Sequence, residues 1–181
     1  KAKDVIKKYC PSDSMTSPKT QGKVHGGTDE WNTPQDIVES VGEFLEVIDL
    51  DVSSNSKEKP NVPALNHLTI EDNSLTHLWF GAKLWMNPPF SDVKAFVKKW
   101  VDYFTNGGGV EGIALTKLDS RTQWFELMMD ACDAFCIVRG YIYFGDGKDA
   151  ATFPIVLWYF GPDAIAWCKA FKVHGWCVPS D

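Results

Sequence analysis

The chain has 181 residues, a length typical of one domain, and 44% of them are hydrophobic, as in an ordinary globular protein. No apolar run approaches the length of a membrane span and no signal peptide is visible, so we expect a cytoplasmic protein with no membrane contact. The net charge of −6 does not by itself indicate a nucleic-acid binder.

Charge is unevenly distributed along the chain. Residues 1–23 hold six lysines and two aspartates, so this segment carries about +4 and the remainder about −10. Residues 1–28 are polar and lack a sustained hydrophobic period. We therefore predict a basic, flexible arm over 1–28 and a single domain over 29–181. The arm fits either a phosphate contact or a solvated tail.

The first half of the chain predicts one helix and two strands. A helix begins near Pro34, with Asn32 or Thr33 as its cap. A strand is expected over 47–52, an irregular segment over 53–68, and a strand over 83–86 that precedes two prolines.

The second half alternates helices and strands. Helices are predicted over 91–104, over 120–134 with Trp124, Leu127 and Met128 inward, and over 163–171; a buried strand is predicted over 110–116. Two β segments, 135–144 and 152–160, flank an Asp-Gly turn and predict a hairpin. The order predicts an α/β fold with a mostly parallel sheet and an antiparallel hairpin at its edge.

The segment Asn87-Pro88-Pro89-Phe90 carries the strongest chemical signal. Two prolines end a strand rigidly, at the carboxyl end where open α/β sheets bind ligands. There, a planar amine could donate to the Asn87 carboxamide and the Pro88 carbonyl while its ring stacks on Phe90. This is the geometry for methylating the amino group of a flipped-out base. The alternative is a stiffened loop whose phenylalanine fills the core.

Other patterns are weaker. The glycines at 107–109 precede a strand, so they indicate a helix end and not a phosphate loop. The five cysteines are odd in number, which favours reduced thiols, and Cys132 and Cys136 suggest one buried helical face. A zinc site from Cys168, His174 and Cys177 matches no common spacing, so we expect no metal.

Several segments together resemble the small phage and prophage DNA N-6-adenine methyltransferases, the Dam-type family. The segments that carry this resemblance are Trp31-x-Thr33-Pro34, 49–54, 87–90, 115–125 and Arg139-Gly140. The resemblance implies a Rossmann-like methyltransferase fold, S-adenosylmethionine (SAM) as methyl donor, double-stranded DNA as partner, and a bacterial host cell. The glycine-rich turn of many methyltransferases is absent after residue 51.

The resemblance also implies roles for individual residues. Asn87, Pro88, Pro89 and Phe90 would form the catalytic loop. The implied cofactor residues are Trp31, Thr33, Pro34, Asp49, Asp51, Ser53, Ser54, Asp72 and Asn87. Basic residues near the loop are candidate DNA contacts: Lys117, Arg121, Arg139 and Lys148.

Two further functions stay open on the sequence. The same loop could methylate a protein glutamine or an RNA base, because a glutamine amide offers the same hydrogens. The fold could also serve as a binding module without turnover. The sequence indicates neither the recognised DNA sequence nor the oligomeric state.

Overall fold

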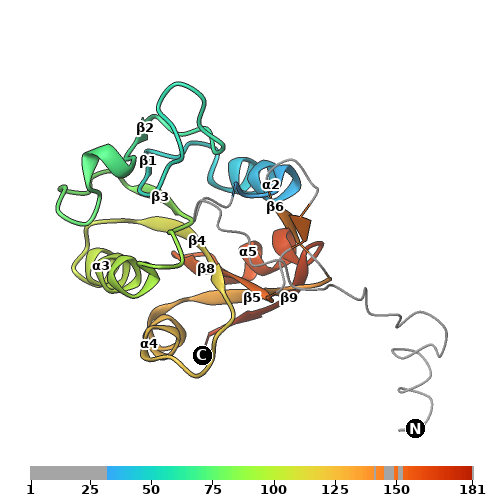
Figure 1. Ribbon diagram of the computed structural model, residues 1–181. Coiled ribbons are helices and arrows are strands. Elements are labelled where there is room, and N and C mark those ends of the chain that lie inside the picture. The colour runs from blue at the N-terminus through green and yellow to red at the C-terminus, as the bar shows by residue number, and fades with distance from the viewer. Residues whose placement is uncertain (1–31, 141, 145–148, 151–152, 181) are drawn as a thin grey trace, which may run out of the picture.

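The structure, a computed structural model, describes residues 32–140, 142–144, 149–150 and 153–180. Its centre is a seven-stranded sheet with the order β2-β1-β3-β4-β8-β5-β9 (Figure 1). The strands that run in one direction are β1 (Leu50–Asp51), β2 (Asn66–His67), β3 (Lys83–Met86), β4 (Glu111–Lys117) and β5 (Ala134–Val138). β8 (Ile155–Phe160) and β9 (Gly175–Pro179) run against them.

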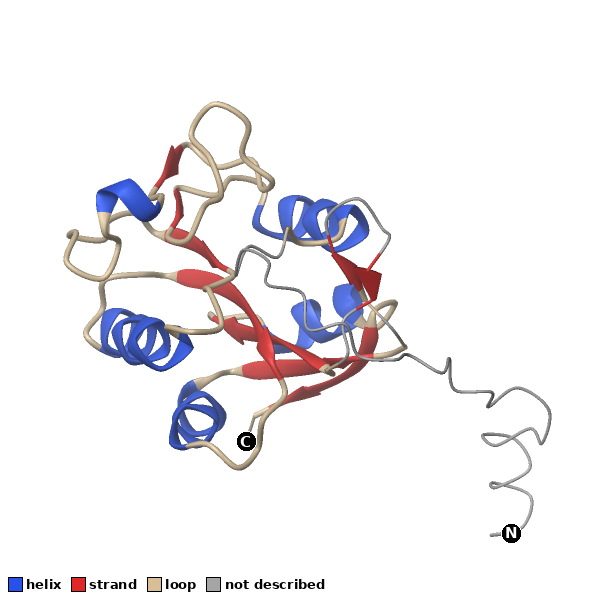
Figure 2. Ribbon diagram, viewed as in Figure 1, coloured by secondary structure: helices blue, strands red, loops and turns tan. Residues whose placement is uncertain are grey.

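Helices cover both faces of the sheet (Figure 2). On one face lie α2 (Gln35–Leu45) and α5 (Ala164–Phe171), and on the other lie α3 (Val93–Thr105) and α4 (Gln123–Ala131). Alternate strand residues fill the two cores, as the two-residue period of a strand requires: Trp85 packs toward α2 and α5, whereas Leu84 and Met86 pack toward α3 and α4. The result is the Rossmann-like, three-layer α/β fold that the sequence predicts.

The predicted hairpin forms, but its second strand does not lie at the sheet edge. β5 and β8 pair antiparallel, and the connection between them carries a separate two-stranded sheet, β6 (Tyr143–Phe144) with β7 (Asp149–Ala150). β8 is inserted between β4 and β5. The edge of the sheet beyond β5 is formed by β9, a strand that the sequence did not predict. The aromatic and branched side chains of β8 are buried at every position, which fits an interior strand.

Four local predictions were wrong in detail. Pro34, not Asn32 or Thr33, is the N-cap of α2, with no side-chain cap. Leu127 is exposed, whereas Trp124 and Met128 are buried as predicted. Cys132 caps the end of α4 and Cys136 lies on β5, so they share no helical face. Residues 66–67, within the segment predicted to be irregular, form β2. Within the described residues, no helix is long and apolar enough to cross a bilayer.

Candidate active site

Parallel strands place their carboxyl ends at one edge of the sheet, and the predicted site residues gather there. Asp51 ends β1, Asn87 follows β3, Lys117 ends β4 and Arg139 follows β5. The strand order reverses beside β1, which has β2 on one side and β3 on the other. Open α/β sheets bind ligands at the carboxyl ends of the strands beside such a reversal.

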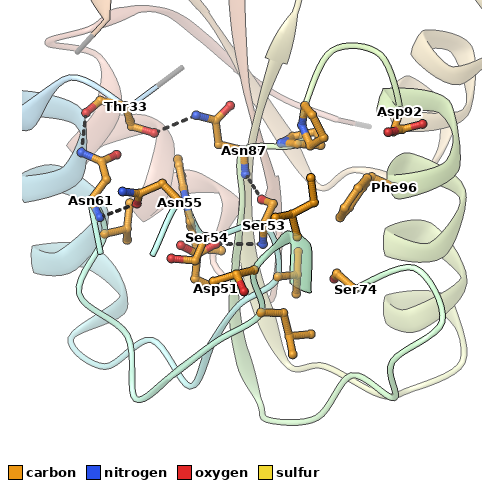
Figure 3. Close-up of a pocket in the computed structure, with 18 of the residues that line it drawn as sticks. Thr33, Asp51, Ser53, Ser54, Asn55, Asn61, Ser74, Asn87, Asp92 and Phe96 are labelled. Carbon is orange, nitrogen blue, oxygen red and sulfur yellow. Dashed lines mark hydrogen bonds between the residues drawn. The ribbon is translucent and has the colours of Figure 1, made fainter. Parts of the chain in front are cut away.

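A pocket of about 410 Å³ opens at this edge, within the size range of small-molecule sites (Figure 3). Its wall is formed by the segment before α2, the residues that follow β1 and β2, and the loop between β3 and α3. The polar lining residues are Asn32, Thr33, Asp51, Ser53, Ser54, Asn55, Asn61, Thr69, Asn73, Ser74, Asn87, Ser91 and Asp92. The apolar ones are Val52, Val62, Leu68, Ile70, Leu75, Trp85, Pro88, Pro89 and Phe96.

Asp51 is the buried acid of this pocket, with 3% of its surface exposed. Burial raises the pKa of its carboxyl to about 7, although hydrogen bonds from the Ser53 amide and the Ser54 side chain act in the opposite direction. The Ser53 amide donates to Oδ1 at 3.0 Å. A carboxyl that ionises near neutral pH inside a pocket is suited to a ligand that donates hydrogen bonds or carries positive charge.

Asn87 is fixed by its main chain and by its side chain. Its amide donates to Ser53 Oγ at 2.9 Å, and its Nδ2 donates to Thr33 Oγ1 at 3.1 Å. Figure 3 shows the carboxamide oxygen pointing away from Thr33. The prolines that follow make the sharp turn into α3, where the Asp92 amide donates to the Pro89 carbonyl at 3.0 Å. The loop thus presents an oriented carboxamide at the pocket rim.

Phe90 lies beyond the pocket lining and contacts an aromatic and a basic residue. Its ring meets the Phe153 ring edge to face, with centroids 5.0 Å apart. The Lys117 ammonium lies 4.5 Å from the centre of the Phe90 ring, a cation–π contact. Phe90 therefore belongs to a half-buried cluster beside the loop and does not plug either core.

The structure does not bring Asp49, Asp72 or Pro34 into the pocket lining. Asp49 Oδ2 accepts from the amides of Ala82 and Lys83 at 2.7 and 2.8 Å, at the start of β3 and so at the opposite sheet edge. Asp72 caps the short 3-10 helix η1 (Ile70–Asp72) and pairs with Lys57 at 2.6 Å. That contact, together with the Thr69 amide, lowers the pKa of Asp72 to about 2. Trp31 lies outside the described residues.

The basic candidates differ in their surroundings. Arg121 is exposed and pairs with Asp119, with Nε 3.0 Å from Oδ1. Arg139 Nη2 donates to the carbonyls of Lys172 and Gly175 at 3.1 and 3.3 Å, so it holds the segment between α5 and β9. Lys148 lies outside the described residues.

Sequence reasoning missed the far wall of the pocket. It expected residues 53–68 to be irregular, which they mostly are, but assigned no role to residues 55–68. Asn61 and Asn55 are linked there, and Leu75 and Phe96 close the apolar side. The one available signal for Asn55 and Asn61 was their place in the loop after β1, because loops that follow parallel strands line such sites. In the part of the chain that the structure describes, no group of three or more histidine, cysteine or acidic residues could hold a metal ion.

Comparisons with known proteins show which family the chain belongs to. The family model of the DNA N-6-adenine-methyltransferase (Dam) family matches residues 20–153, which include the loop 87–90. The chain is similar to the DNA N-6-adenine-methyltransferase of Haemophilus phage HP1 (strain HP1c1), with 28% identity over 143 residues, 75% of this chain and 80% of the relative. It is also similar to the DNA N-6-adenine-methyltransferase of Escherichia phage T1, with 26% identity over 125 residues, 68% of this chain and 50% of that relative.

Proposed function

Because the chain belongs to the DNA N-6-adenine-methyltransferase (Dam) family and is thus an enzyme that methylates adenine in DNA, we propose that it transfers the methyl group of SAM to the exocyclic amino group of an adenine flipped out of duplex DNA. The observation that carries the proposal is the junction of two features at one sheet edge. The oriented Asn87 carboxamide lies directly beside a pocket that contains a buried acid.

The chemistry of the pocket fits SAM. The carboxyl of Asp51, with a pKa of about 7, suits a ligand with a cationic ammonium and ribose hydroxyls. Ser53 and Ser54 add polar groups, and Leu68, Leu75 and Phe96 supply an apolar wall for the adenine ring. When bound, SAM supplies an electrophilic methyl group on sulfonium, so the transfer uses no covalent enzyme intermediate.

The task of the protein is then to orient and activate the target amine. The amine lone pair is delocalised into the adenine ring. Hydrogen bonds from its two hydrogens to the Asn87 carboxamide oxygen and the Pro88 carbonyl favour a tetrahedral nitrogen, which localises that pair for attack. Phe90 holds the base by stacking. The base then takes the place of the Lys117 ammonium on the face of the Phe90 ring. The freed Lys117 can pair with a phosphate of the strand.

The decisive experiment removes the acceptor and leaves the turn. Asn87→Ala keeps both prolines, so we expect S-adenosylhomocysteine still to bind in calorimetry. Single-turnover transfer of tritiated methyl from SAM to unmethylated DNA should fall at least about a hundredfold, as when one preorganised polar group of a transition state is lost. Unimpaired transfer by Asn87→Ala would reject the mechanism.

Phe90 variants test the base-stacking role in the same assay. Phe90→Trp should keep part of the rate, because any aromatic face stacks on a base, whereas Phe90→Ala should lose most of it. If Phe90 served only to fill space, Phe90→Ala would instead lower the free energy of unfolding by about 3–5 kcal/mol. The same methyl-transfer assay with glutamine-containing peptides and with RNA tests the two alternative substrates. Transfer to DNA alone would exclude both.

A further inference from the structure

The proposed chemistry places a requirement on Asn87 that the backbone alone does not meet. A carboxamide has one end that accepts hydrogen bonds and one that donates them, and its terminal torsion has a broad, roughly two-fold preference. Only the orientation with the oxygen toward the target amine accepts the amine hydrogens. With the nitrogen there, donors face donors. Some neighbouring group must therefore select one orientation.

Among the described residues, Thr33 is such a group. Its Oγ1 accepts from Asn87 Nδ2 at 3.1 Å, which directs the nitrogen toward Thr33 and leaves the oxygen on the other side (Figure 3). The Ser53 hydroxyl cannot do this, because it accepts from the Asn87 main-chain amide, which fixes the Cα and leaves the side-chain torsion free.

Thr33 is itself held rigidly. It is 3% exposed, and its carbonyl accepts from Asn61 Nδ2 at 3.1 Å. The next residue, Pro34, has a fixed φ, and its carbonyl accepts from the amides of Ile37 and Val38 at the start of α2. The buried stripe of α2 is packed against the sheet, so the Thr33 hydroxyl is positioned by the core.

We propose that Thr33 is a positioning residue for methyl transfer, which selects the Asn87 orientation with the carboxamide oxygen toward the target amine. This inference rests on the proposed function. It assigns to Thr33 a role different from the cofactor contact that the family resemblance implies. The two roles separate in kinetics, because a cofactor contact acts on SAM affinity and a positioning contact acts on the rate at saturating SAM.

The test compares, in the full chain, Thr33→Val, which replaces the hydroxyl with a methyl group of similar size, and Thr33→Ser, which keeps the hydroxyl. Thr33→Val should lower the single-turnover rate at saturating SAM about tenfold, the effect of losing one hydrogen bond. Its dissociation constant for S-adenosylhomocysteine should stay within about twofold of wild type, because a positioning contact acts on the rate of transfer and not on cofactor affinity. Thr33→Ser, which retains the hydroxyl, should restore most of the rate. Thr105→Val, a matched loss of a threonine hydroxyl at an exposed position at the end of α3, should change neither quantity.

A double variant separates positioning from other effects. If Thr33 acts through Asn87, adding Thr33→Val to Asn87→Ala should cause no further loss of rate. An additive loss, a Thr33→Ser as slow as Thr33→Val, or a weakened affinity with a normal saturated rate would each overturn the inference. If Thr33→Val does not fold, Thr33→Ala replaces it, because alanine adds no atom to the site. Thr33→Ala is then compared with Thr33→Ser, which differs from it only by the hydroxyl. A fully active Asn87→Ala rejects the proposed function instead, whereas an inactive Asn87→Ala beside a normal Thr33→Val rejects only the role of Thr33.

Discussion

Asp51, a predicted cofactor residue, is buried in the wall of the pocket, and its burial predicts a pH effect. The pKa of its carboxyl is raised to about 7, so at pH 6 most molecules of the free enzyme hold a proton there. A ligand that donates to the ionised carboxylate favours the deprotonated form. Binding therefore lowers that pKa and releases a proton, and affinity rises with pH up to about 7 and then levels off.

Calorimetry with S-adenosylhomocysteine at pH 6, in buffers of different ionisation enthalpy, measures this proton release. We expect a fraction of one proton per site at pH 6, little at pH 8, and affinity higher at pH 8 by up to about tenfold. Asp51→Asn is the control, since it should bind more weakly and without the pH dependence. Proton uptake, or a wild-type affinity that does not change with pH, would show that the ligand leaves Asp51 protonated.

Asp49 was predicted as a cofactor residue but lies outside the pocket lining, because the prediction lacked the pairing of the strands. Both acids occur in the motif at 49–54, two positions apart, and alternate residues of a strand share a face. The observed strand is only two residues long, so Asp49 precedes it and caps the backbone at the start of β3. Pairing with β3 places Asp49 at one end of the strands and Asp51 at the other. The sequence around the two acids does not contain this pairing.

At the scale of elements, strong local signals predicted the strands and the hairpin, but not the position of β8 in the sheet or the edge strand β9. β3 occupies the predicted residues 83–86, because the Pro-Pro turn defines its end. β9 was missed, since its side chains are mostly exposed and Pro179 ends it, so no buried alternation is visible. The position of β8 between β4 and β5 is set by pairing among all the strands of the sheet. The local sequence of β8 does not show which strands will be its neighbours.

One element-level prediction concerns the tether between α3 and the loop that follows η1. Lys99 donates to the carbonyls of Ser74, Leu75 and His77, and its ammonium lies 4.7 Å from the centre of the Trp79 ring. Partial burial lowers the pKa of Lys99. Because Ser74 and Leu75 line the pocket, this tether preorganises one wall of the proposed cofactor site.

Lys99→Met should therefore weaken S-adenosylhomocysteine binding severalfold and lower the free energy of unfolding by about 2 kcal/mol, as expected when charge-assisted hydrogen bonds are lost. The neighbouring Lys98→Met on the exposed face of α3 removes the same charge without the tether and should change neither quantity. Equal effects from both variants in calorimetry and urea unfolding would show that charge, not the tether, is responsible.

At the scale of the whole molecule, the charge distribution poses a problem for a DNA enzyme. Residues 24–181 carry about −10, and the basic side chains Arg121 and Arg139 near the site already have protein partners. The six lysines of residues 1–23 are the largest basic cluster along the chain. They lie outside the described residues, and the family match begins only at residue 20. A domain of this charge gains most from a separate basic segment that contacts phosphates.

Deleting residues 1–23 should therefore weaken binding to duplex DNA and flatten its salt dependence. Each lysine that contacts a phosphate contributes about 0.9 to the slope of log affinity against log salt, because it releases condensed counterions. The slope should fall by about 3–5 if most of the six lysines take part, and the affinity for S-adenosylhomocysteine should stay the same. Replacing the six lysines with glutamine separates charge from chain length and should reproduce the deletion. A slope that both variants leave unchanged in fluorescence-anisotropy titrations would show that the acidic domain binds DNA without the arm.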